Sequence, residues 1–126
     1  MANEATTPAR KAVEAFFEGF NSRSNDGMRA AMNFPHVRLA GGRVRIVEGA
    51  EDFATPFDRL AETEGWHHST LDACEVVHAG ADKVHFDVTF SRYHEDGTKY
   101  ATHRSLWVLT HVDGRWGVQA RSSFAP

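Results

Sequence analysis

The sequence predicts an α+β domain, in which helices come first and an antiparallel sheet follows. Three observations predict it. Aromatic residues recur at helical spacing near the N-terminus, two Asp-Gly turns divide the last third of the chain, and the strands joined by those turns share one apolar face. We therefore expect the 126 residues to form one domain, spanning residues 1–126.

The first expected element is a helix with an aromatic stripe. Thr7-Pro8 is typical of a helix start, with a hydroxyl at the N-cap and proline in the first turn. The apolar residues that follow at helical spacing are Val13, Phe16, Phe17 and Phe20. Such a stripe is usually buried, so we expect this helix to cover the apolar face of the sheet.

Short elements follow this helix. Residues 28–32 form at best a short second helix, which ends at Phe34-Pro35 because the residue before a proline avoids the helical region. Residues 37–39 and 44–47 flank Gly41-Gly42, a pattern that indicates a small hairpin.

The middle of the chain predicts a third helix and a first long strand. Residues 50–61 carry apolar side chains at helical spacing, but Pro56 falls among them, so this helix is either kinked or starts late. Residues 66–77 are expected to form a strand, which a loop at Gly80 connects to three further strands.

The two Asp-Gly turns allow the last three strands to be aligned by counting. Asp-Gly favours a two-residue turn, because both central positions need positive φ. Two such turns, at Asp96-Gly97 and Asp113-Gly114, would set the register of both hairpins. The expected pairs are Phe90–His103, Val88–Ser105, Phe86–Trp107, Leu109–Val118, Trp107–Ala120 and Ser105–Ser122.

This register places apolar residues on one face of the sheet and mostly polar residues on the other. His103 and Ser105 are polar exceptions on the apolar face, beside Trp107, which is typical of a pocket wall. Leu106 and Val108 are apolar exceptions on the other face, and they indicate either a subunit contact or ordinary exposed side chains.

Composition excludes several classes of protein. A net charge of −3, with no concentration of Lys and Arg, argues against nucleic-acid binding. The single cysteine, Cys74, rules out an internal disulfide and a cysteine-based zinc cluster. We find no signal peptide and no apolar run of the roughly 20 residues that a membrane helix needs, so we expect a cytoplasmic protein without membrane contact.

Three segments resemble the nuclear transport factor 2-like (NTF2-like) superfamily, in its SnoaL-like and ketosteroid-isomerase-like branch. They are the helix containing residues 12–17 with its Phe20-Asn21 end, the helix after Glu48-Gly49, and the closing pattern of residues 112–118, Val-Asp-Gly-Arg-Trp-Gly-Val. The resemblance implies a cone-shaped, curved antiparallel sheet wrapped around the N-terminal helices, as in a cystatin-like α+β barrel. It also implies a deep pocket at the open end and a homodimer through the convex sheet face. Members include isomerases, dehydratases, cyclases and binding modules, so the fold alone does not choose a reaction.

His103 and Asp72 are the candidate catalytic residues. A histidine moves protons near neutral pH, and a neighbouring aspartate orients the ring and stabilises its charged form. The strand at residues 66–77 has two possible registers, because its loop carries no two-residue turn signal. One register puts Asp72 and His68 on the pocket face, and the other puts Glu75 there; we favour the first because a buried, unpaired Glu75 would be costly.

The candidate binding residues are aromatic, cationic or hydroxylic. Trp66, Trp107 and Phe90 could stack on a flat ligand or simply form core. His36 and Arg38 follow the Phe34-Pro35 break, where an arginine could hold a carboxylate or enolate oxygen. The remaining candidates are His68, Ser105 and Ser122, which could position an oxygen.

Two functional hypotheses follow from these residues. One is an isomerase, dehydratase or cyclase acting on a small apolar or polycyclic molecule, with His103 as general acid or base and Asp72 as its partner. The other is a binding module or dimeric assembly domain with the same pocket and no turnover. No histidine pair has metal-ligand spacing, so we expect no metal and no cofactor.

Overall fold

A computed structural model describes residues 4–125 of the chain. The helices are α1 (Thr6–Asn21), α2 (Asn25–Ala30) and α3 (Phe57–Glu64), with a 3₁₀ turn at Ala50–Asp52. The strands are β1 (Met32–Ala40), β2 (Arg43–Val47), β3 (His68–Ala79), β4 (Lys83–Tyr93), β5 (Lys99–Val112) and β6 (Arg115–Ser123). They form one sheet in the order β2-β1-β6-β5-β4-β3, in which only the β1–β6 pair is parallel. The expected α+β architecture is confirmed.

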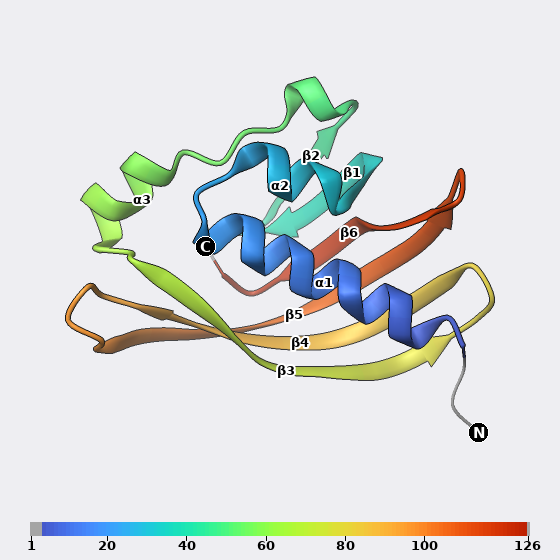
Figure 1. The fold of residues 1–126 in the computed structure, drawn as a ribbon. Coiled ribbons are helices and arrows are strands. Elements are labelled where there is room, and N and C mark those ends of the chain that lie inside the picture. Colours follow the sequence, from blue (N-terminus) through green and yellow to red (C-terminus); the bar gives the residue numbers. More distant parts are fainter. Residues whose placement is uncertain (1–3, 126) are drawn as a thin grey trace.

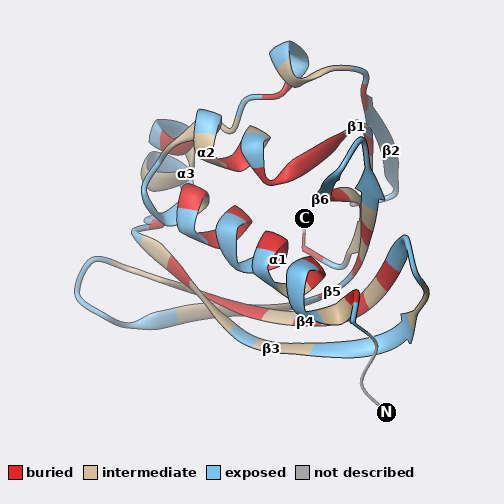
Figure 2. Cartoon of the chain, turned by 45° about the vertical axis from the view of Figure 1, so that its right-hand side comes forward, coloured by how far each residue is buried: buried red, intermediate tan, exposed pale blue. Residues whose placement is uncertain are grey.

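Helix α1 lies across one face of the curved sheet, as Figure 1 shows. We call this the inner face and the opposite one the outer face. Figure 2 shows that the buried residues of α1 and of the strands lie where the two layers meet. The aromatic stripe joins this core as expected, since Val13, Phe16 and Phe17 are buried and Phe20 is partly buried against Trp66.

Helix boundaries differ in small ways from those expected. Helix α1 begins at Thr6, with Ala5 at the N-cap, so Thr7 is not the cap. Helix α2 begins earlier than expected because the Ser24 hydroxyl accepts a hydrogen bond from the Gly27 N–H, 2.9 Å away. Of the two alternatives for the third helix, the late start is confirmed, because α3 begins directly after Pro56.

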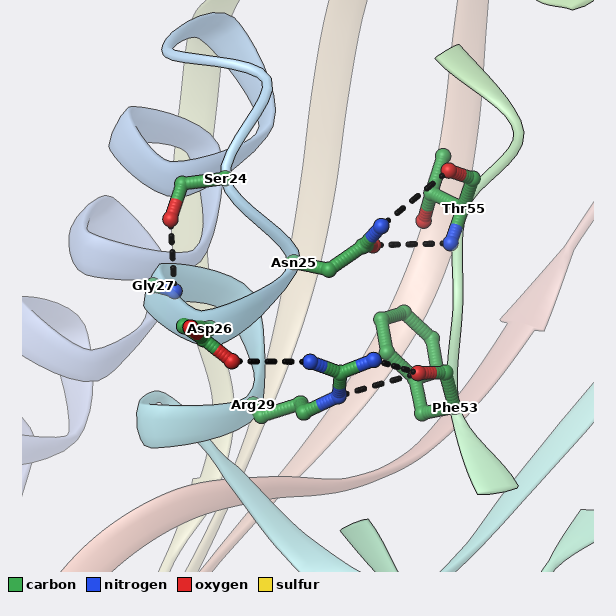
Figure 3. A network of polar contacts seen from close by, with 7 residues as sticks. All are labelled: Ser24, Asn25, Asp26, Gly27, Arg29, Phe53 and Thr55. Carbon is green, nitrogen blue, oxygen red and sulfur yellow. Dashed lines mark hydrogen bonds and ion pairs between the residues drawn. The ribbon is translucent and has the colours of Figure 1, made fainter. Parts of the chain in front are cut away.

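A polar network joins α2 to the segment that precedes α3 (Figure 3). The Asn25 amide pairs with the backbone of Thr55, accepting from its N–H at 2.8 Å. The Arg29 guanidinium donates to the Phe53 carbonyl oxygen at 2.9 and 2.6 Å and pairs with Asp26 at 2.8 Å. These bonds fix the connection that runs from β2 past α2.

The β4–β5 register is confirmed at the pocket wall, where Phe86, Val88 and Phe90 face Trp107, Ser105 and His103. The expected two-residue turn at Asp96-Gly97 is wrong, because Tyr93 pairs with Lys99 across a longer loop and a register shift beside Tyr93 restores the pairs of the wall. The β5–β6 register is correct near the turn, with Leu109 opposite Val118, and wrong beyond it. Gln119 is an extra residue between two successive pairs, so Trp107 faces Arg121 rather than Ala120 and Ser105 faces Ser123 rather than Ser122. Phe124, the residue after β6, is 88% exposed.

Strand β3 follows neither of its two expected registers throughout. Leu71 faces Phe90, but Ala73 faces Thr89, so Asp72 is an extra residue between the two pairs. The bulge moves the following side chains to the other face. Ser69 and Leu71 therefore point inward before it, and Cys74 points inward after it.

No helix within residues 4–125 is both long enough and apolar enough to cross a membrane.

Candidate functional site

A hollow lies between α1 and the inner face of the sheet. The space among its lining atoms is about 410 Å³ including the part open to solvent, and the centre of a water molecule can occupy about 40 Å³ of it. Its aromatic walls are Phe16, Phe17, Phe20, Phe90 and Trp107. Its polar side chains are Arg38, Arg92, Arg121, Ser69, Ser105 and Ser123. The Phe17 and Trp107 rings stack on each other with centroids 5.3 Å apart and form one aromatic wall of the hollow.

Two lining side chains carry buried N–H groups without a hydrogen-bond partner. Within residues 4–125, only Trp107 Nε1 and Arg92 Nε are buried side-chain polar atoms that lack one. Leaving a buried donor unpaired costs about 1–3 kcal/mol, so folded proteins rarely keep such groups. Both atoms are donors, and both belong to residues that line this hollow.

Arg121 is held in place by His36 and by two aromatic rings. The Arg121 Nε–H donates to His36 Nε2, 3.2 Å away, while the His36 Nδ1–H donates to the Val118 carbonyl oxygen, 3.0 Å away. The guanidinium carbon lies 5.0 Å from the centre of the Phe16 ring and 5.6 Å from that of Trp107. Burial, with the charge of Arg121, lowers the pKa of His36 to about 4, so His36 is neutral at pH 7 and can accept this hydrogen bond.

The other two arginines of the hollow differ in their partners. Arg92 forms an ion pair with Glu64 at 2.9 Å, and the Tyr100 hydroxyl donates to the same carboxylate oxygen at 2.9 Å. Arg38 has no carboxylate within ion-pair distance among the described residues. Burial, followed by the charges of Arg92 and of Arg45, lowers its pKa.

Four of the expected site residues line the hollow: Phe90, Ser105, Trp107 and Arg38. Ser105 donates to Ser123 at 3.0 Å, the partner that the bulge supplies. His103 faces the same way as Phe90, with ring centroids 5.5 Å apart, but does not itself line the hollow. Burial, together with the charge of Arg92, lowers the pKa of His103.

The expected pairing of Asp72 with His103 is wrong. The carboxylate of Asp72 accepts hydrogen bonds from Thr70, at 2.7 Å, and from Ser91. Ser91 faces Thr102 across β4–β5 and their hydroxyls lie 2.9 Å apart, so these groups belong to the outer face while His103 belongs to the inner face. The sheet itself separates the two candidate catalytic residues.

Four further candidates lie outside the hollow. Trp66 is buried core, and its Nε1–H donates to the Ser69 hydroxyl at 3.0 Å. His68 stacks on Tyr93 at 4.8 Å, and Ser122 faces Leu106 on the outer face. His36 is 0% exposed, so it supports Arg121 instead of forming the rim.

The sequence analysis did not find Arg92, Arg121, Ser69 or Ser123 as lining residues. Arg121 and Ser123 reach the inner face through the bulge at Gln119, which the Asp-Gly turn does not reveal. In the register that places Glu75 on the pocket face, which we did not favour, Ser69 also lies on that face. For Arg92, the expected register could have given the correct face, because it lies two residues beyond Phe90.

The lining set contains donors and hydroxyls but neither a carboxylate nor an imidazole. It can hold an acceptor oxygen or an anion, but it lacks a group that would take a proton from carbon. Nor do the residues from 4 to 125 contain a cluster of three or more His, Cys, Asp or Glu side chains that could hold a metal ion.

Comparison with solved structures identifies the fold. A protein of unknown function with a cystatin-like fold from Nostoc punctiforme is similar with a TM-score of 0.78 and 9% identity, over 98% of this chain and 92% of that one. A ketosteroid isomerase-like protein from Erwinia carotovora atroseptica is similar with a TM-score of 0.68 and 18% identity, over 99% of this chain and 100% of that one. A structure from Catenulispora acidiphila in complex with S-DNPA is similar with a TM-score of 0.72 and 14% identity, over 95% of this chain and 92% of that one.

No protein-family model matches the sequence, and no curated protein matches it. This chain has the NTF2-like, cystatin-like fold, as the resemblance implied.

Proposed function

We propose that this protein binds a small organic molecule with a flat apolar body and at least one acceptor oxygen in the hollow beneath α1. The observation that carries the proposal is the pair of unpartnered buried donors, Trp107 Nε1 and Arg92 Nε, on residues of the same hollow. A ligand oxygen would satisfy such a donor, while the aromatic walls would cover the ligand's rings.

The lining favours binding over turnover. Proton-transfer chemistry would need a base within hydrogen-bond reach of the substrate, roughly 3 Å. Asp72 lies on the outer face, and His103 lies behind Phe90 without lining the hollow. We therefore favour the binding module over the isomerase, dehydratase or cyclase.

The test uses the three tryptophan indole N–H signals in a ¹H–¹⁵N NMR spectrum. Planar aromatic probes of one size, 2-naphthol, 2-naphthamide and 2-naphthoate, are titrated into the protein. We expect at least one probe to shift the Trp107 signal, assigned by Trp107→Phe. The Trp116 signal is the internal control, since that ring stacks on His111 outside the hollow. If every probe leaves the Trp107 signal unmoved, the hollow is not a binding site for this class of molecule.

The second expected partner, another copy of this chain, stays a prediction. Leu106 and Val108 lie on the outer face, and Leu106 is 39% exposed. On the same face, β1 and β2 add three exposed apolar side chains: Leu39, Val44 and Ile46.

A further inference from the structure

We propose that the ligand is an organic acid whose carboxylate is held between Arg38 and Arg121. This inference rests on the proposed function and names the chemical class of the molecule. It is carried by the position, the partners and the orientation of these two arginines.

Arg38 and Arg121 are direct neighbours in the sheet. They are register partners in the parallel β1–β6 pair, and both line the hollow. Neighbouring strands lie about 4.8 Å apart, so the two cationic side chains leave the same face at almost the same place. Like charges at such positions repel one another, and this arrangement is unfavourable unless an anion lies between them.

Neither Arg38 nor Arg121 has a carboxylate partner among residues 4–125, whereas three other arginines do. Arg92 pairs with Glu64 at 2.9 Å, Arg29 pairs with Asp26 at 2.8 Å, and Arg104 pairs with Asp87. The chain has 17 Asp and Glu residues against 14 Lys and Arg, so carboxylates are not scarce. Arg38 and Arg121 therefore lie side by side in the hollow without a counter-charge from the described residues.

The guanidinium of Arg121 is oriented so that its terminal nitrogens remain available. Its Nε–H is bonded to the neutral His36, and its central carbon lies 5.0 Å from the centre of the Phe16 ring and 5.6 Å from that of Trp107. Neither terminal nitrogen has a hydrogen-bond partner within the described chain. A guanidinium presents donors in a planar fork that matches the two oxygens of a carboxylate.

The electrostatics agree with this geometry. Burial, followed by the charges of Arg38 and Arg45, lowers the pKa of Arg121 to about 9, so the positive charge is disfavoured in the ligand-free protein yet present at pH 7. A bound carboxylate would offset that penalty. Because Phe17, Phe90 and Trp107 form the adjoining wall, the remainder of the acid should be a flat apolar group.

The experiment compares 2-naphthoate with its neutral carboxamide by isothermal titration calorimetry. We expect the carboxylate to bind at least about tenfold more tightly, because a charge-assisted bidentate contact is roughly twice as strong as a neutral one. Arg121→Gln should remove about tenfold or more of the affinity for naphthoate and leave that for naphthamide nearly unchanged. Arg43→Gln is the matched control, since it removes one positive charge from an exposed hairpin position outside the hollow.

Each outcome decides between the two proposals. Equal affinity for acid and amide would overturn the organic-acid inference but leave the proposed function intact. An equal loss of naphthoate affinity in Arg43→Gln and Arg121→Gln would also overturn it. The acid would then be attracted by the general positive charge of this region and not by a site in the hollow. Binding of neither probe, with the Trp107 indole signal unmoved, would overturn both proposals. If Arg121→Gln fails to fold, Arg38→Gln gives the same test from β1.

Discussion

Gly117→Ala should separate β1 from β6 and lower the stability of the protein. A Cβ at position 117 would lie 2.8 Å from the carbonyl carbon of Met32 and 2.9 Å from the backbone nitrogen of Asn33. These are backbone atoms of β1, so no side-chain rotation relieves the clash. The strand would have to move by about 0.6 Å to restore ordinary van der Waals contact.

Existing bonds resist that movement. Asn33 Nδ2 donates to the carbonyl and hydroxyl oxygens of Thr110, both at 2.9 Å, and the Val118 N–H donates to Ala31 O at 2.9 Å. Overpacking of this kind costs about 1–3 kcal/mol, and weakening these bonds adds about 1 kcal/mol. The reduced entropy of the unfolded chain returns about 0.4–1 kcal/mol. We expect a net loss of about 1–4 kcal/mol, which lowers Tm by roughly 3–15 °C for a domain of this size.

The measurement is urea unfolding followed by circular dichroism, with Gly80→Ala as the matched control. A Cβ at Gly80 would meet nothing closer than the Lys83 carbonyl oxygen, at 3.6 Å, so this variant should stay within about 0.5–1 kcal/mol of the parent. Equal stability of the two variants would refute the reasoning. Because β1 carries Arg38 beside Arg121, Gly117→Ala should also weaken binding of naphthoate.

Four further predictions concern other residues. The pKa of His36 falls from 6.5 to about 4 on folding, so His36 leaves the free energy of unfolding unchanged above pH 6.5 and should lower it by up to about 3 kcal/mol as the pH falls toward 4. In urea unfolding measured at several pH values, His36→Gln should reduce this dependence of stability on pH. Asp72→Ala should leave the affinity for naphthoate within about twofold in calorimetry, since Asp72 lies on the outer face. A larger loss of affinity would show that Asp72 belongs to the binding site. Burial raises the pKa of Cys74 to about 11, so the thiol should react with iodoacetamide at pH 8 much more slowly than after unfolding, and equal rates would contradict this. If the outer face joins two copies of the chain, Leu106→Asp should convert the dimer to a monomer in analytical ultracentrifugation. A parent protein that is monomeric in the same experiment would contradict the expected dimer.

Local patterns were enough to predict the class of fold. The helical spacing of Phe16, Phe17 and Phe20 predicts a buried stripe because a surface helix has one face against the core. The Asp113-Gly114 turn fixes the register of the nearest pairs because its geometry is set by two residues, and Asp113 indeed has positive φ. Both features depend only on residues close together in the chain.

The site depended on contacts that no local pattern contains. A single extra residue in β6, Gln119, turns Arg121 and Ser123 toward the inner face. A second extra residue, Asp72, moves the β3 side chains that follow it to the opposite face of the sheet. Bulges arise from how strands meet across a curved sheet, and neither carries a turn signal.

The sequence by itself therefore determined the α+β class, the aromatic cover of the sheet and four residues of the pocket wall, Phe90, Ser105, Trp107 and Arg38. Only the tertiary structure decided that Arg38 and Arg121 lie side by side, because β1 and β6 are far apart in the chain and pair in parallel. It also decided that Asp72 and His103 lie on opposite faces. Periodicity assigns a residue to a face only until the first bulge, and beyond that point the packing of the whole sheet sets the chemistry of the hollow.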